Sequence, residues 1–145
     1  MRIHTRGRSG VTLIELLIVT GIIAVLSSVA IPRAARIIDR INVDGATRHA
    51  ATVFVSARHA AIANSRFSAV RINEGTATIT AVVGTDTVVS RNLGEMFGVT
   101  IRATRDSMAY SPVGLGYGAA NLRLIIRRGQ AADTLFTSRV GRVRR

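Results

Sequence analysis

The sequence predicts an α+β protein, with a long N-terminal helix packed on a small antiparallel β-sheet domain. Two observations predict this fold class. An apolar segment near the N-terminus continues into residues with helical periodicity, and the chain then changes to short alternating runs separated by turn residues. Because the chain has 145 residues, it has room for one compact domain and a multidomain enzyme is not expected.

The composition excludes several kinds of site. The chain has no cysteine, so it forms no disulfide, thiolate metal site or cysteine nucleophile. Its formal net charge is +12, and all 20 basic residues are arginine. Genomic codon bias explains an arginine-only composition more simply than selection for anion binding does, so the charge alone identifies no partner.

Residues 11–31 form the first predicted element, a transmembrane helix. This segment of 21 residues is long enough to span a bilayer. Residues 1–10 before it are polar and basic, which is typical of a targeting leader. Arginines flank the segment almost equally on both sides, and Asp39 together with the N-terminal amine favours a cytoplasmic N-terminus slightly.

Glu15 is the one ionisable residue of this segment. A carboxylate in hydrocarbon costs about 2.5–3.5 kcal/mol and is rarely kept without a partner. If the chain were cut before Val11, the new α-amino group would be the nearest cation, in the same subunit or in a neighbour. The alternative is that Glu15 lies close enough to the membrane interface to reach water or to take up a proton.

The run from Ser9 to Leu17, SGVTLIELL, resembles the class III signal of type IV prepilins and of type II secretion pseudopilins. The resemblance implies that prepilin peptidase cuts between Gly10 and Val11 on the cytoplasmic face and methylates the new N-terminus. Glu15 then becomes the fifth residue of the mature chain, and Pro32 becomes the twenty-second, where this family usually has proline. Val11 departs from the phenylalanine or methionine that is usual at its position.

An ordinary secretory signal peptide is the rival interpretation. Residues 28–30, Ser-Val-Ala, fit a small-x-small cleavage site that would release a soluble periplasmic domain starting at Ile31. Glu15 argues against this, because the apolar core of such a signal carries no charge.

Residues 32–66 are predicted to continue the long helix, and residues 67–145 to form an antiparallel β-sheet head domain. Pro32 can kink the helix at the membrane exit. The pair at 44–45, Asp-Gly, is the weak point of the helix, and Arg58 is assigned to its solvated face. The apolar stripe that should pack on the sheet contains Ile37, Ile38, Ile41, Ala50, Val53, Phe54, Ala57 and Ala61. Strands are predicted at 67–72, 76–83, 87–91, 99–103, 122–127 and 134–140.

Later features resemble minor pilins or pseudopilins of the GspH/FimT type. They are Ala57 and Arg58 late in the helix, the Ser-Pro-Val-Gly turn at 111–114, and the closing Gly-Arg-Val-Arg at 141–144. A pilin-like fold is what this resemblance implies.

No enzyme, cofactor or metal site is predicted. The histidines show no ligand spacing, the carboxylates form no acid–base pair, and the glycine-rich run at 114–118 precedes no helix that would bind phosphate. The C-terminal arginines are the candidate binding residues. Arg142 and Arg144 share one face of an extended strand, Arg145 follows, and Gly141 permits close backbone approach. No aromatic residue alternates with these arginines along the chain. A charged, aggregation-resistant edge is the alternative explanation for them.

The resulting hypothesis is a minor pseudopilin of a type II secretion system. The subunit would lie in the bacterial inner membrane as a single-pass protein with a periplasmic head, and would assemble with other pilins or pseudopilins into a filament through Glu15 and its apolar helix. The alternative is a minor type IV pilin of the FimT kind that binds DNA during natural transformation, through Gly141, Arg142, Arg144 and Arg145.

Overall fold

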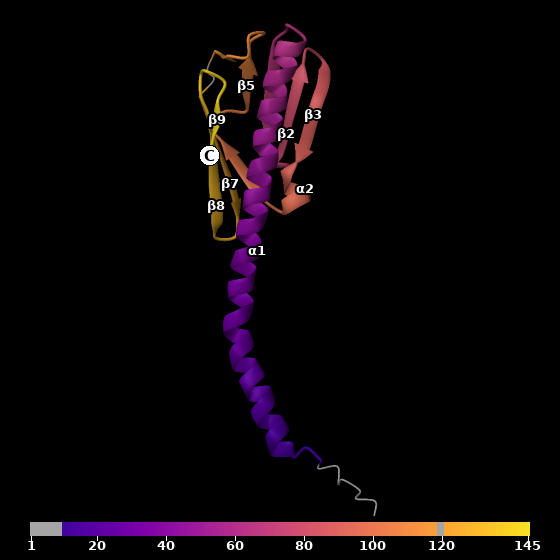
Figure 1. Cartoon of the computed structure of the whole chain (residues 1–145), viewed down its shortest axis with the longest axis vertical. Helices are drawn as coiled ribbons and strands as arrows, with labels where there is room; N and C mark the ends of the chain where they lie inside the picture. Colours follow the sequence, from indigo (N-terminus) through magenta and orange to yellow (C-terminus); the bar gives the residue numbers. More distant parts are fainter. Residues whose placement is uncertain (1–9, 119–120) are drawn as a thin grey trace, which may run out of the picture. The chain divides into compact units, whose positions relative to one another are not determined.

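A computed structural model of the chain describes residues 10–118 and 121–145, and Figure 1 shows the order of its elements. The predicted leader lies outside the described residues apart from Gly10. The first element is α1 (Leu13–Ala63), a helix of 51 residues with Pro32 inside it. The chain divides into two compact units, Met1–Ala35 and Arg36–Arg145, which we call the N-terminal unit and the C-terminal unit.

The helix α1 continues through the predicted weak point at Asp44 and Gly45. Asp44 forms an ion pair with Arg48, one turn later in the helix, with 2.7 Å between Asp44 Oδ2 and Arg48 Nη2. A Cβ atom at Gly45 would lie 2.8 Å from Cε1 of Phe97. The glycine therefore serves the close approach of this aromatic ring, and no helix break is needed to explain it.

The end of α1 is fixed by a Schellman motif. The Arg66 amide donates to the Ala61 carbonyl, and the Ser65 amide donates to the Ile62 carbonyl, each at 3.1 Å. Ser65 takes the left-handed conformation that this motif requires, with φ of 49°. The helix thus ends at Ala63, three residues before the predicted boundary at 66.

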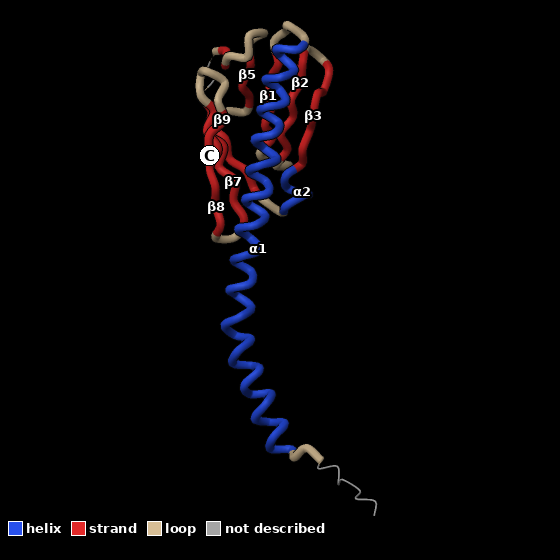
Figure 2. The backbone as a smooth tube through the Cα atoms, in the orientation of Figure 1, coloured by secondary structure: helices blue, strands red, loops and turns tan. Residues whose placement is uncertain are grey.

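The strands form two antiparallel sheets, where the sequence predicted one sheet (Figure 2). The five-stranded sheet has the order β3 (Asp86–Asn92), β2 (Thr78–Val83), β1 (Ser68–Asn73), β5 (Ser107–Tyr110) and β6 (Gly116–Tyr117). The four-stranded sheet has the order β4 (Thr100–Ala103), β7 (Leu122–Arg128), β8 (Ala131–Thr137) and β9 (Val143–Arg144).

Several elements differ from the predicted ranges. The strand expected at 134–140 is β8, which begins three residues earlier because Gly129, with φ of 53°, allows a tight turn directly after β7. The strand β9 (Val143–Arg144) covers only part of the extended strand expected around Arg142 and Arg144. The short strands β5 and β6 were not predicted. Neither was α2 (Leu93–Phe97), which is capped by Asn92 through a 3.1 Å bond from the Glu95 amide.

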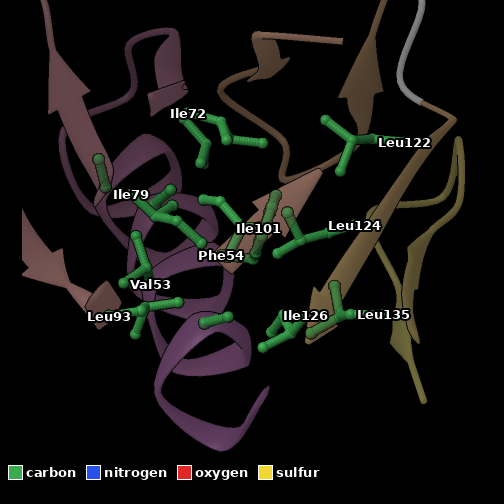
Figure 3. Close-up of a cluster of buried hydrophobic side chains, with 14 of the residues drawn as sticks. Val53, Phe54, Ile72, Ile79, Leu93, Ile101, Leu122, Leu124, Ile126 and Leu135 are labelled. Atoms are coloured by element: carbon green, nitrogen blue, oxygen red, sulfur yellow. The ribbon is translucent and has the colours of Figure 1, made fainter. Parts of the chain in front are cut away.

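One hydrophobic core joins α1 to both sheets of the C-terminal unit (Figure 3). Val53 and Phe54 of α1 are fully buried, together with Ile79 of β2 and Leu124 of β7. The stripe on α1 is shorter than predicted, because the core begins at Val43. The earlier isoleucines are exposed by 52% to 64%: Ile37, Ile38 and Ile41. These three side chains are therefore free for contacts with other molecules.

Candidate functional site

The predicted cleavage site lies just before α1. Gly10 and Val11 are exposed and precede the first helical residue, Leu13. Thr12 caps the helix, since its Oγ1 accepts a bond of 3.2 Å from the Glu15 amide. Thr12 and Glu15 are spaced as in a capping box, and the Glu15 carboxylate lies in the first turn, where the helix dipole favours a negative charge.

The side chains around Glu15 are apolar and exposed. The helix α1 has a segment long and apolar enough to cross a membrane, and none of that segment is buried inside the protein. Two of its hydroxyls bond within the helix: Thr20 donates to the carbonyls of Leu16 and Leu17 at 2.9 and 3.0 Å, and Ser28 donates to the Val25 carbonyl at 2.7 Å. The Glu15 carboxylate has no ion-pair partner within the described part of the chain.

Three short motifs from distant parts of the sequence meet at one place in the C-terminal unit. Arg58 of α1 donates from Nε to the Gly114 carbonyl at 2.9 Å. A Cβ atom at Gly141 would lie 2.5 Å from that same carbonyl oxygen and 3.5 Å from Arg58 Nε. The predicted solvated position of Arg58 is therefore wrong, because the side chain is partly buried under these turns. The absence of a side chain at Gly141 allows the close approach of the Gly114 carbonyl.

Tyr110 of β5 forms the floor of this meeting point. Its side chain is fully buried, and its Cε1 would lie 3.3 Å from a Cβ atom at Gly141. Burial raises the pKa of the Tyr110 phenol to about 12, against a smaller opposing effect of the Arg58 charge. The phenol is therefore neutral at physiological pH.

The C-terminal arginines do not act as one group. Arg145 is ion-paired with Asp44 of α1 and with Asp133 of β8. Arg142 and Arg144 are exposed and form no ion pair with residues 10–118 or 121–145. Arg144 and Arg145 are neighbours at the end of β9, so they project to opposite sides of the sheet. Arg145 stabilises the fold, whereas Arg142 and Arg144 remain free to bind a ligand.

The Arg145 contact predicts an acid-sensitive contribution to stability. The hydrogen bond from Arg145 holds the pKa of the Asp44 carboxyl below its ordinary value of 3.8. This contribution is therefore present above pH 3.8 and is lost as the pH falls through the lowered pKa. Arg145→Gln should lower the thermal unfolding midpoint at neutral pH, and the difference from the unmodified chain should narrow below pH 3.8. A difference that stays constant across this range would contradict the assignment.

An exposed aromatic residue that the sequence did not single out lies among arginines on the four-stranded sheet. Phe136 of β8 is 49% exposed, and it is the register partner of both Arg123 on β7 and Arg144 on β9. The alternation of β8 places Phe136 outward, because Leu135 is buried in the core. Strand pairing created this arrangement, so no spacing along the chain could have indicated it.

The described residues contain no group of three His, Cys, Asp or Glu side chains that would hold a metal ion. The glycine-rich run at 114–118 ends the connection from β5 and contains β6 itself, and Gly114 lies in a turn closed by its amide, which donates to the Ser111 carbonyl at 2.8 Å.

Comparison with known proteins finds matches to the N-terminal motif and to the fold. Residues 5–31 match the family described as the prokaryotic N-terminal methylation motif. The fold is similar to a crystal structure of the type IV minor pilin FimU of Pseudomonas aeruginosa PAO1, with a TM-score of 0.61 and 12% identity over 72% of this chain and 88% of that one. The chain is type IV pilin-like. A second FimU crystal form gives a TM-score of 0.58 at 12% identity over 70% and 90% of the two chains.

No curated protein matches the sequence of this pilin-like chain significantly. The prepilin motif implies processing by prepilin peptidase, anchoring in a membrane and assembly with other pilins. The pilin-like fold and the motif are those of structural subunits. The cut at Gly10, the assembly role of Glu15 and Pro32, and binding by the C-terminal arginines stay predictions.

Proposed function

We propose that this pilin-like chain is a minor subunit of a membrane-anchored filament, cut between Gly10 and Val11 by prepilin peptidase. The match of residues 5–31 to the methylation motif carries the proposal. It is supported by the exposure of Gly10 and Val11, which precede α1 and would be the residues on either side of the cut. The mature chain would cross the inner membrane once with a cytoplasmic N-terminus, and its C-terminal unit would lie in the periplasm.

Glu15 is proposed to set the register between subunits in the filament. Its carboxylate would pair with the methylated α-amino group of a neighbouring subunit, while the exposed apolar side chains of residues 11–31 supply the burial. An ion pair between two groups in apolar surroundings forms only in a narrow range of geometries, so it selects one axial position of the helix.

The mass of the N-terminal peptide from the membrane fraction of the native host tests the processing step. We expect a chain that starts at Val11 with one added methyl group. A chain that starts at Ile31 would instead identify a secretory signal peptide and a released periplasmic domain. That result would contradict the filament proposal together with the role of Glu15.

The filament is proposed to be the pseudopilus of a type II secretion system, in which the chain supports protein secretion. The alternative, a minor type IV pilin of the FimT kind that binds DNA, is favoured by the unpaired, exposed Arg142 and Arg144. Deletion of the gene separates the two. Loss of extracellular enzyme activity with normal uptake of DNA would support the pseudopilus, and the reverse pattern would support the alternative.

A further inference from the structure

Three exposed isoleucines lie together on α1, just before the core of the C-terminal unit begins. We call Ile37, Ile38 and Ile41 the isoleucine patch, and their side chains are exposed by 52% to 64%. Residues three and four positions apart on a helix are neighbours, so the three side chains form one apolar surface. A cluster of exposed apolar side chains marks a contact with another protein or with a membrane.

The isoleucine patch faces away from the hydrophobic core. Asp39 pairs with Arg128 of β7, and Val43 is buried in the core, so both side chains point toward the sheets. Ile37 and Ile41 each come two residues earlier, and two residues turn an α-helix by about 200°. Their side chains therefore lie on nearly the opposite side of α1, where the sheets do not cover them.

Two arginines flank the isoleucine patch. Arg36 and Arg40 each precede an isoleucine of the patch by one residue, so they lie about 100° from it around the helix. Both side chains are exposed, and neither forms an ion pair within residues 10–118 and 121–145. An apolar surface bordered by cations is typical of a helical segment that lies in the interface of a bilayer.

The nearest carboxylates along α1 are already engaged with other arginines. Asp39 Oδ1 accepts a bond of 3.0 Å from Arg128 Nε, and Asp44 pairs with Arg48 and with Arg145. Neither carboxylate neutralises the two arginines that flank the isoleucine patch. The flanks of the patch therefore keep their positive charge, which favours an anionic partner.

A groove of about 620 Å³ lies beside the isoleucine patch, between α1 and the end of the β7–β8 hairpin. Arg40 and Ile41 of the helix line it, together with Gln130 and Ala131 of the hairpin, among others. The guanidinium can bind a phosphate, the amide can bind hydroxyl or ester oxygens, and the apolar side chains can contact hydrocarbon. These three groups occur together in a phospholipid.

The isoleucine patch cannot move far from the membrane that residues 11–31 are proposed to cross. Ile37 follows Ile31 by six residues, and even an extended chain spans at most about 3.6 Å per residue. Ile37 therefore stays within about 22 Å of the end of the apolar segment in any arrangement of the two units. The phosphates of the adjoining headgroup layer are the anions that lie within this reach.

We infer that the isoleucine patch docks on the membrane surface, with Arg36 and Arg40 on the phosphates of anionic phospholipids. The isoleucines enter the boundary between headgroups and acyl chains, and the arginines add attraction to acidic lipids. The inference rests on the proposed anchoring of residues 11–31 in a membrane and adds a second, lipid-selective contact made by the C-terminal unit. This contact holds the C-terminal unit at the bilayer until the chain leaves the membrane for a filament.

The test uses the full chain, incorporated as a single copy in lipid nanodiscs. Because the chain has no cysteine, Ile38→Cys accepts a polarity-sensitive fluorophore at a unique position. Discs of phosphatidylcholine alone are compared at low salt with discs that also contain phosphatidylglycerol. We expect the anionic lipid to shift the emission of the label to the blue as the docked fraction rises. A label on Val55→Cys, which replaces a 45% exposed side chain of the same helix, should not respond.

Charge variants of the labelled chain test the contact with phosphate. Arg36→Gln and Arg40→Gln should each lower the ratio of docked to undocked chain about fivefold in the anionic discs. The matched control is Arg91→Gln, which removes an exposed arginine of β3 and should leave the ratio unchanged. Salt at about 1 M should abolish the response, because it shortens the screening length to about 3 Å.

A second pair of variants tests the apolar part of the contact. Ile41→Gln should lower the ratio of docked to undocked chain about tenfold, because it removes apolar burial in the interface. Val55→Gln changes another exposed apolar side chain of α1 and should leave the ratio unchanged. All of these side chains lie outside the core, so each variant should keep its fold, which circular dichroism checks.

Three results would overturn the inference. They are a label at Ile38→Cys that ignores the anionic lipid, equal losses from Arg91→Gln and from the two flanking arginines, and a response that appears only in discs loaded with several copies. The last result would assign the isoleucine patch to a contact between subunits. A chain that fails to enter the discs would contradict the proposed anchoring as well, whereas entry with an unresponsive label would contradict this inference alone.

Discussion

A chain with Glu15→Ala is expected to enter the membrane normally and to be missing from filaments. Removal of the carboxylate makes insertion easier, since a charge in the hydrocarbon costs about 2.5–3.5 kcal/mol. In the proposed filament, the same change would leave the α-amino group of a neighbouring subunit without its partner, and the loss of one member of a buried pair costs about 3–5 kcal/mol. Incorporation should therefore fall by about 100-fold or more. Immunoblots of the membrane fraction and of sheared filaments measure the two quantities separately.

Thr20→Ala is the matched control for this experiment. It also removes a polar group from the apolar segment, but the Thr20 hydroxyl already bonds to the carbonyls of Leu16 and Leu17 in its own helix. The Thr20 variant should insert and assemble normally. Normal incorporation of the Glu15 variant would contradict the proposed register role. The only remaining explanation for Glu15 would then be its favourable position in the first turn of α1.

Replacing Gly141 by alanine should destabilise the C-terminal unit strongly. The backbone at Gly141 has φ of 72°, which costs an L residue about 1–2 kcal/mol. The new Cβ atom would also lie 2.5 Å from the Gly114 carbonyl oxygen, and such overpacking costs about 1–3 kcal/mol more. The expected loss is about 2–5 kcal/mol in the free energy of unfolding. Chemical denaturation of the full chain in detergent, followed by circular dichroism, measures it.

Gly118→Ala separates the two causes. Gly118 has a similar φ of 64°, but a Cβ atom there would meet nothing within 4 Å. Its cost should be limited to the backbone term of about 1–2 kcal/mol. Equal losses in the two variants would show that the close packing between the turns at Gly114 and Gly141 contributes nothing.

The long helix and most strands were predictable because their signals are local. An apolar run of membrane length, three- and four-residue spacings and alternating strands all lie within short windows of sequence. The weak point at Gly45 was misjudged because its explanation, the ring of Phe97, comes from a distant part of the chain. A propensity against helix was overridden by tertiary packing.

The candidate binding face was hidden for a related reason. Arg142 and Arg144 were recognised from their spacing, but Phe136 becomes their neighbour only through the pairing of β8 with β9. The sequence indicated Arg144 and Arg145 equally as candidate binding residues. In the structure the two side chains project to opposite sides of the sheet, because successive residues of an extended chain alternate in direction. One of the carboxylate partners of Arg145, Asp44, is far from it in the sequence, and the other, Asp133, lies on the strand that pairs with β9.

The hydroxyls of Thr20 and Ser28 bear on the transfer of the apolar segment from lipid into contact with other protein chains. Because both donate to carbonyls of their own helix, neither needs to exchange a partner when lipid around the segment is replaced by protein. Glu15 is the one ionisable side chain of residues 11–31, so it is the one group whose charge would need a new partner during that transfer. In the proposed filament, the chemical change on entering or leaving would therefore be concentrated at Glu15, whose carboxylate would gain or lose its ion-pair partner there.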